Sequence, residues 1–114
     1  MEENKFLFIP VKGEIKILTL SGDKLLDDFY KFIGCDSIEI VRVVGGRYLM
    51  VVDDEGKVCK PSKDMNFRAS CGYLGFPAEY IAGDVLIGKF NGIDDIVGLS
   101  SAEAKVLQSI FNGF

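Results

Sequence analysis

Two short runs rich in apolar residues, FLFI at 6–9 and IKIL at 15–18, occur in the first twenty residues and have the length and composition of β-strands. In the stretch NKFLFIPVKGEIKILTL, Phe6 and Phe8 alternate with their neighbours, and Ile15 and Ile17 flank Lys16. A proline and a glycine separate the two runs. The pattern therefore predicts two strands joined by a turn.

Two other segments follow the helical period. SGDKLLDDFYKFIG places its apolar residues on one helical face and most of its charges on the other. Ser21 or Asp23 can cap its start, and Gly34 can end it. In LSSAEAKVLQSIFNGF, Ser100 and Glu103 have the spacing of a capping box. We expect two main helices.

Between these helices the alternation predicts further strands. SIEIVRVVGGRYLMVV reads as a hairpin turning at Gly45-Gly46, with the apolar stretch 48–52 lying centrally in the sheet. A short strand is expected near residues 57–59. GDVLIGKF predicts another strand, in which Gly88 marks a bulge or a close approach.

The segment 61–83 lacks a regular pattern, apart from a short helix that begins near Asp64 and ends by Gly72 or Gly75. The fold class is thus α+β: a mixed, mainly antiparallel sheet of about five or six strands, two main helices, and a short helix in this segment. The 114 residues suit a single domain spanning 1–114.

The charge and the cysteines narrow the classes of function. A net charge of −4 disfavours duplex nucleic acid and anionic membranes as partners. No apolar run suits a signal peptide or a membrane span, so we expect a cytoplasmic protein. The absence of histidine excludes serine–histidine and cysteine–histidine nucleophiles. Cys35, Cys59 and Cys71 lack metal-site spacing, so we expect no metal, no cofactor and no disulfide network.

A basic stretch in this acidic chain is the first candidate site. Lys60, Lys63 and Arg68 could pair with the phosphate oxygens of a nucleotide or another anionic ligand. Asn66 could read an edge of that ligand and Tyr73 could stack on it. The alternatives are structural: the cations solvate a loop, Asn66 caps the short helix, and Tyr73 packs on the sheet.

Two further hypotheses stay open. An acidic surface could mimic nucleic acid and occupy the basic groove of a host protein. Its members would be Asp27, Asp28, Asp53, Asp54 and Glu55. A small enzyme using a lysine or a cysteine, with Cys71 as one candidate, would need a side chain of displaced pKa in a pocket.

Over nearly its whole length the chain resembles the domain of unknown function 3846-like family of small phage, plasmid and mobile-element proteins. The motif residues are Glu55-Gly56, Asn66, Ala69, Tyr73 and the strand Asp84 to Gly88. The resemblance implies a mobile-element accessory protein, one that could counter host defence. Because the sequence contains no recognisable set of catalytic residues, we expect a non-enzymatic protein that binds a host factor or sequesters a small anionic ligand. A homodimer could form through Phe111 and Phe114.

Overall fold

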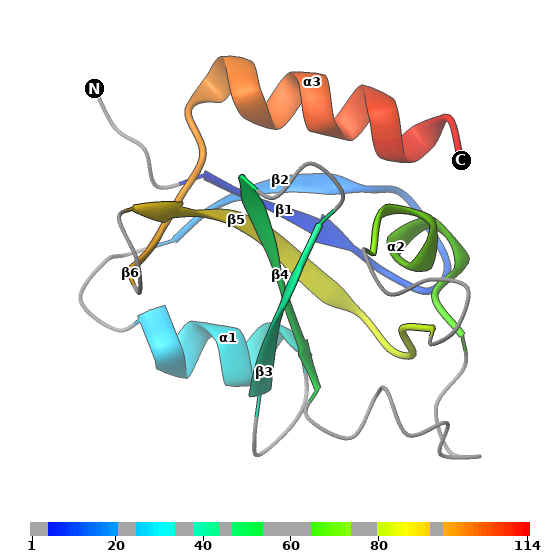
Figure 1. The fold of residues 1–114 in the computed structure, drawn as a ribbon, viewed down its shortest axis with the longest axis horizontal. Coiled ribbons are helices and arrows are strands. Elements are labelled where there is room, and N and C mark those ends of the chain that lie inside the picture. Colours follow the sequence, from blue (N-terminus) through cyan, green and yellow to red (C-terminus); the bar gives the residue numbers. More distant parts are fainter. Residues whose placement is uncertain are drawn as a thin grey trace.

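The structure is a computed structural model and describes residues 5–20, 25–33, 38–43, 47–53, 65–73, 80–91 and 95–114. Within these residues, six strands form one antiparallel sheet (Figure 1). The strands are β1 (Lys5–Ile9), β2 (Lys16–Thr19), β3 (Ile38–Arg42), β4 (Tyr48–Asp53), β5 (Val85–Asn91) and β6 (Asp95–Val97). The predicted α+β fold is confirmed.

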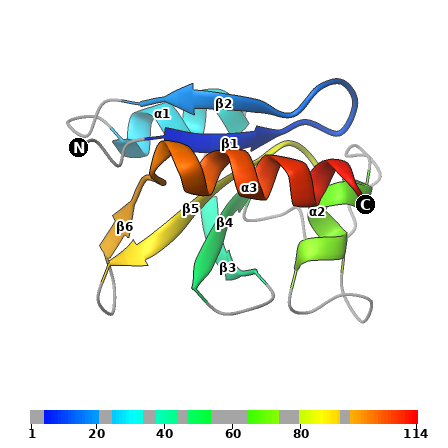
Figure 2. The same ribbon diagram turned by 90° about the horizontal axis from the view of Figure 1, so that it is seen from above.

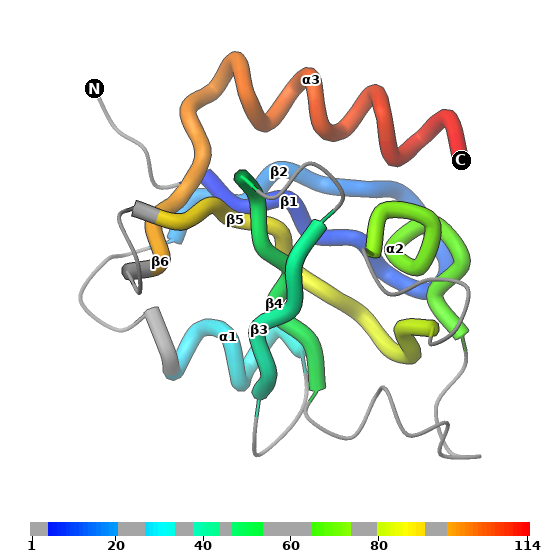
Figure 3. Tube along the Cα trace, in the orientation of Figure 1, coloured from blue at the N-terminus to red at the C-terminus, as the bar shows by residue number. Residues whose placement is uncertain are grey.

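Strand β5 is the centre of the sheet, whose order is β2-β1-β5-β4-β3 (Figure 3). Ile87 lies opposite Leu7 of β1 on one side and opposite Met50 of β4 on the other. The last residues of β5 pair with β6. Two strand pairs that are distant in sequence, β1–β2 and β3–β4, are therefore joined through one strand.

Helices cover both faces of this sheet. Helix α1 (Leu25–Ile33) lies against one face, and α2 (Phe67–Gly72) and α3 (Ser101–Asn112) lie against the other (Figure 1). Seen from above, α3 runs along the sheet and α2 lies near its carboxyl end (Figure 2). The result is a helix–sheet–helix arrangement with two apolar layers.

The two cores follow from the alternation of side chains along each strand. In β4, Met50 and Val52 point to the core under α2 and α3, which includes Leu107 and Phe111. Leu49 and Val51 point to the core under α1. Because both faces are covered, residues 49–52 are fully buried, as expected for a strand inside the sheet.

Several local predictions are also confirmed. Ser100 and Glu103 form the capping box of α3. Gly13, in the β1–β2 turn, has a φ of 103°, which favours glycine. A Cβ at Gly88 would lie 2.7 Å from Phe6 Cε2, so the close-approach alternative holds. Strand β6 was not predicted, because its three residues, DIV, are too few for an alternating pattern.

Other expectations lie outside the described residues, namely the Gly45-Gly46 turn, the strand near 57–59, Cys35 and Cys59. Cys71 has a free thiol.

No helix in the described ranges has the length and apolar character needed to cross a bilayer.

Candidate functional site

Asn66, a predicted ligand-binding residue, is a buried helix cap. It precedes α2, and its Oδ1 accepts a hydrogen bond from the Ala69 N–H at 3.1 Å. Its Nδ2 donates to the carbonyls of Ile9 and Gly83, each at 2.9 Å. The side chain is 0% exposed, so both amide hydrogens are used inside the protein. The capping alternative is confirmed.

Arg68 holds the turn between β1 and β2. Its Nη2 donates to the carbonyls of Pro10 at 2.8 Å and Gly13 at 2.9 Å. Because a guanidinium carries several donors in a fixed plane, it can bridge two carbonyls of one turn. The cation predicted to meet a phosphate therefore stabilises a loop.

The same turn is held by a second motif residue of the family resemblance. Asp84 Oδ1 accepts a hydrogen bond from the Val11 N–H at 2.9 Å. Asn66, Arg68 and Asp84 thus all bind residues 9–13, the carboxyl end of β1 and the turn after it. Asn66 and Asp84, which belong to the motif, therefore hold this part of the fold together, and Arg68, which does not belong to the motif, contributes to the same attachment.

Tyr73 and Ser70 complete the attachment of α2. Tyr73 is 6% exposed and packs in the core beneath α3. Ser70, which the sequence reasoning missed, is fully buried, and its Oγ accepts from the Ile81 N–H at 2.9 Å and donates to the Ile81 carbonyl at 3.2 Å. The residues NFRASC therefore form the cap and most of a short helix that covers part of the sheet. The two lysines of the predicted site, Lys60 and Lys63, lie outside the described residues.

The acidic residues of the alternative hypothesis are not gathered at one place. Asp27 and Asp28 lie in the first turn of α1. Asp53 is the last residue of β4 and is only 8% exposed, so it contributes little to the surface. Asp54 and Glu55 lie outside the described residues. The three described carboxylates therefore form no continuous acidic surface.

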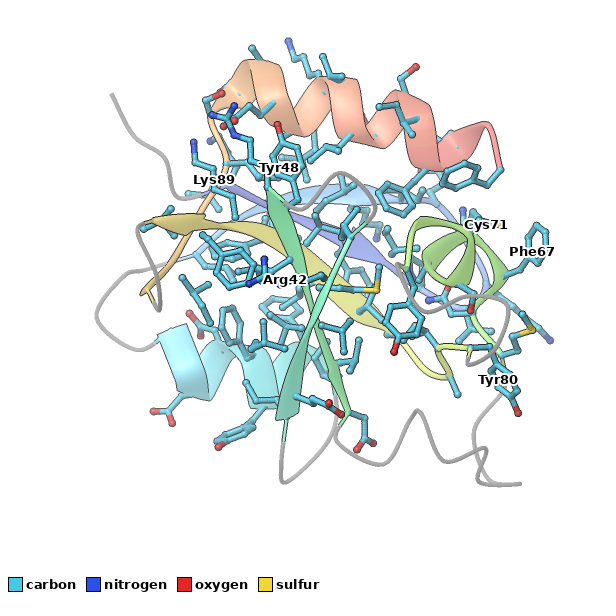
Figure 4. All side chains as sticks on the ribbon, viewed as in Figure 1. Arg42, Tyr48, Phe67, Cys71, Tyr80 and Lys89 are labelled. Carbon is cyan, nitrogen blue, oxygen red and sulfur yellow. The ribbon has the colours of Figure 1, made fainter. Side chains whose placement is uncertain are left out.

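A cleft of about 430 Å³ opens between α2, α3 and the adjacent ends of β3 and β4. Its lining residues are Val43, Tyr48, Cys71, Gly72, Leu107, Ile110, Phe111 and Phe114. Figure 4 shows Tyr48 and Cys71 on opposite sides of the space below α3. Only these two lining side chains carry a polar atom, so the cleft suits an apolar guest.

A charged cluster lies at the Tyr48 end of the cleft. The Tyr48 hydroxyl donates to Glu103 Oε2 at 3.4 Å, and Lys89 Nζ donates to Oε1 at 2.8 Å. Arg47 Nη2 lies 3.6 Å from Oε2. Burial acts to raise the pKa of Glu103, but hydrogen bonds from Lys89 and Ser100 and the charge of Lys89 lower the pKa to about 2. Glu103 is therefore a fixed anion near neutral pH and a poor general acid.

Large apolar side chains gather on the outside of the same helices. Among the described residues, those that are exposed are Met65, Phe67, Val106, Ile110 and Phe114. All five lie on α2, on α3 or within two residues of them, and we call them the apolar face. The sequence carried a signal for this face: α3 has apolar residues at 106, 107, 110, 111 and 114, a stripe wider than its buried side.

The remaining chemistry of the described chain is sparse. Among the residues that the structure describes, no three metal-binding side chains lie together.

Comparison with known proteins gives one match. The family described as "Domain of unknown function (DUF3846)" matches residues 4–112. No curated protein and no solved structure matches the chain.

Proposed function

Because the chain belongs to the DUF3846 family, whose function is unknown, we propose a role from the structure of this member: it is a non-enzymatic binding protein that contacts a host protein through its apolar face. The observation that carries this proposal is that all large exposed apolar side chains of the described residues lie on α2, on α3 or within two residues of them. Two of these side chains, Ile110 and Phe114, line a cleft of about 430 Å³. Patches of this kind mark interaction sites.

The chemistry of the cleft supports binding over catalysis. Its two polar side chains are a phenol that donates to Glu103 and a thiol with no histidine anywhere in the chain to act as its base. Glu103 itself is held as an anion by Lys89. A buried apolar anchor from a partner protein is the guest that these walls fit best.

A mobile-element origin is part of this proposal, because the family resemblance noted in the sequence implies such an origin. An accessory protein of this kind would act by occupying a host factor, including a component of host defence. Sequestration of an anionic ligand has less support, because the described members of that predicted site, Asn66, Arg68 and Tyr73, are engaged in holding the fold.

The test is selection of binding peptides from a random display library with the immobilised full-length chain. We expect the selected peptides to share an aromatic or large aliphatic anchor. Ile110 is 48% exposed at the cleft, so Ile110→Lys should weaken peptide binding about 10-fold or more by placing a charge where an apolar anchor is buried.

The matched control is Lys105→Ala, which changes an exposed residue of α3 outside the cleft lining. We expect this variant to bind the peptides like the wild type. Selected peptides without an apolar anchor, or equal binding by Ile110→Lys, would refute the proposal.

A further inference from the structure

The apolar face is nearly uncharged, although the chain as a whole is acidic. Within the described segment 101–114, Lys105 is the only exposed residue with a charged side chain. The chain carries a net charge of −4, so two copies repel each other on average. Contact through the exposed side of this segment would bring few charged side chains of the two copies together.

The face also carries a projection and a cavity side by side. Phe67 is 55% exposed at the start of α2. Cys71, one helical turn later on the same side of α2, lines the cleft. Figure 4 shows both residues at the same end of the molecule. A volume of about 430 Å³ exceeds what one phenyl ring needs, since pockets of roughly 300–1,000 Å³ hold whole small ligands.

We propose that two copies of the chain form a symmetric dimer in which Phe67 of each copy enters the cleft of the other. A two-fold axis makes such contacts reciprocal, because a projection beside a cavity on one copy meets the cavity beside a projection on the next. This inference rests on the proposed function, because it names the molecule that covers the apolar face when no host protein is bound.

The dimer has a consequence for regulation. Because Phe67 of the second copy occupies the cleft that would receive the anchor of a host protein, self-association and binding of a host protein exclude each other. The apparent affinity for a partner equals the affinity of the monomer multiplied by the fraction of chains that are monomeric. A host protein can therefore bind only those monomers that have dissociated from the dimer.

The test is sedimentation equilibrium of the full-length chain. The wild type should approach twice the single-chain mass of 12.6 kDa with increasing concentration. Phe67→Ser removes the projection from an exposed position, so folding should be unaffected. The dissociation constant of the dimer should rise at least about 10-fold, as for loss of a central aromatic anchor. Cys71→Trp should do the same by filling the cavity, and Lys105→Ala should change nothing.

Mixing the two variants gives the sharper result. Phe67→Ser retains an open cleft and Cys71→Trp retains the projection, so the mixture can form one of the two reciprocal contacts. We expect the mixture to associate more strongly than either variant alone. If circular dichroism shows that Cys71→Trp is unfolded, Ile110→Trp at the cleft serves instead.

A wild type that stays monomeric into the millimolar range would overturn the dimer, as would a Phe67→Ser variant that associates normally or a mixture without complementation. The proposed function fails separately, through the peptide selection. A monomer that binds apolar peptides refutes only the dimer, and a dimer whose peptides lack an apolar anchor refutes only the function.

Discussion

Replacing Asn66 with alanine should destabilise the whole domain. The side chain makes three hydrogen bonds, to Ala69, Ile9 and Gly83, and is 0% exposed. Each bond contributes about 1 kcal/mol, and the buried carbonyls and the helix N–H left behind add a cost of their own. We expect the free energy of unfolding to fall by about 3–5 kcal/mol, which is a large part of the roughly 5–15 kcal/mol of a typical domain.

The assay is urea unfolding followed by far-ultraviolet circular dichroism at neutral pH, together with thermal unfolding. The melting temperature should fall by about 10–20 °C for a domain of this size. Met65→Ala is the matched control, because Met65 precedes Asn66 but is 39% exposed, and it should cost less than about 1 kcal/mol. A loss below about 1 kcal/mol for Asn66→Ala would refute the capping role and return Asn66 to the list of ligand-binding candidates.

Asn66→Asp separates the cap from the two donated bonds. The new carboxyl keeps the acceptor for the Ala69 N–H but, when ionised, places a negative charge against the carbonyls of Ile9 and Gly83. The pKa of the new carboxyl should therefore be higher in the folded than in the unfolded chain. Its cost to stability should grow as the pH rises above about 4 and shrink below it. A cost that does not change with pH would contradict this geometry.

Three other substitutions test the attachment of the helices and strands. Glu103→Gln should lower the free energy of unfolding by about 1–2 kcal/mol above pH 4.5 and by progressively less toward pH 2. The reason is that the Lys89 contact lowers the folded-state pKa of Glu103 from 4.5 to about 2. Urea unfolding at several pH values measures this cost, and a cost that is largest in acid would be contrary evidence. Gly88→Ala should cost about 1–3 kcal/mol by overpacking, since its Cβ would lie 2.7 Å from Phe6 Cε2; a melting temperature equal to the wild type would show that the ring can move. Arg68→Ala should cost about 1–2 kcal/mol and speed amide hydrogen exchange in the β1–β2 turn; unchanged exchange there would mean that the guanidinium bonds do not hold the turn.

The regular elements could be predicted because their patterns are local. The capping box of Ser100 and Glu103 and the apolar run 48–52 of β4 each involve neighbouring residues, and both predictions are confirmed. The order of strands around β5 could not be derived in the same way, because pairing between Leu7 and Ile87 depends on residues far apart in the chain.

The candidate site was harder to predict for a related reason. The residue types of Asn66 and Arg68 suit a ligand site as well as a structural role, and only the carbonyls of Ile9, Pro10 and Gly13 decide between these roles. Those carbonyls belong to the backbone of a remote segment, so side-chain patterns say nothing about them. The cleft beside α3 likewise depends on how α2 packs, although the wide apolar stripe of α3 was readable.

The central place of β5 has a consequence for the order in which the protein can fold during synthesis. The β1–β2 and β3–β4 pairs can form early, but the strand that joins them, Val85–Asn91, follows both pairs in the sequence. Until that strand leaves the ribosome, Leu7 and Met50 have no strand between them to pair with. The nascent chain therefore carries unpaired apolar strand edges until Val85–Asn91 has been made, and such edges are prone to pair with other chains.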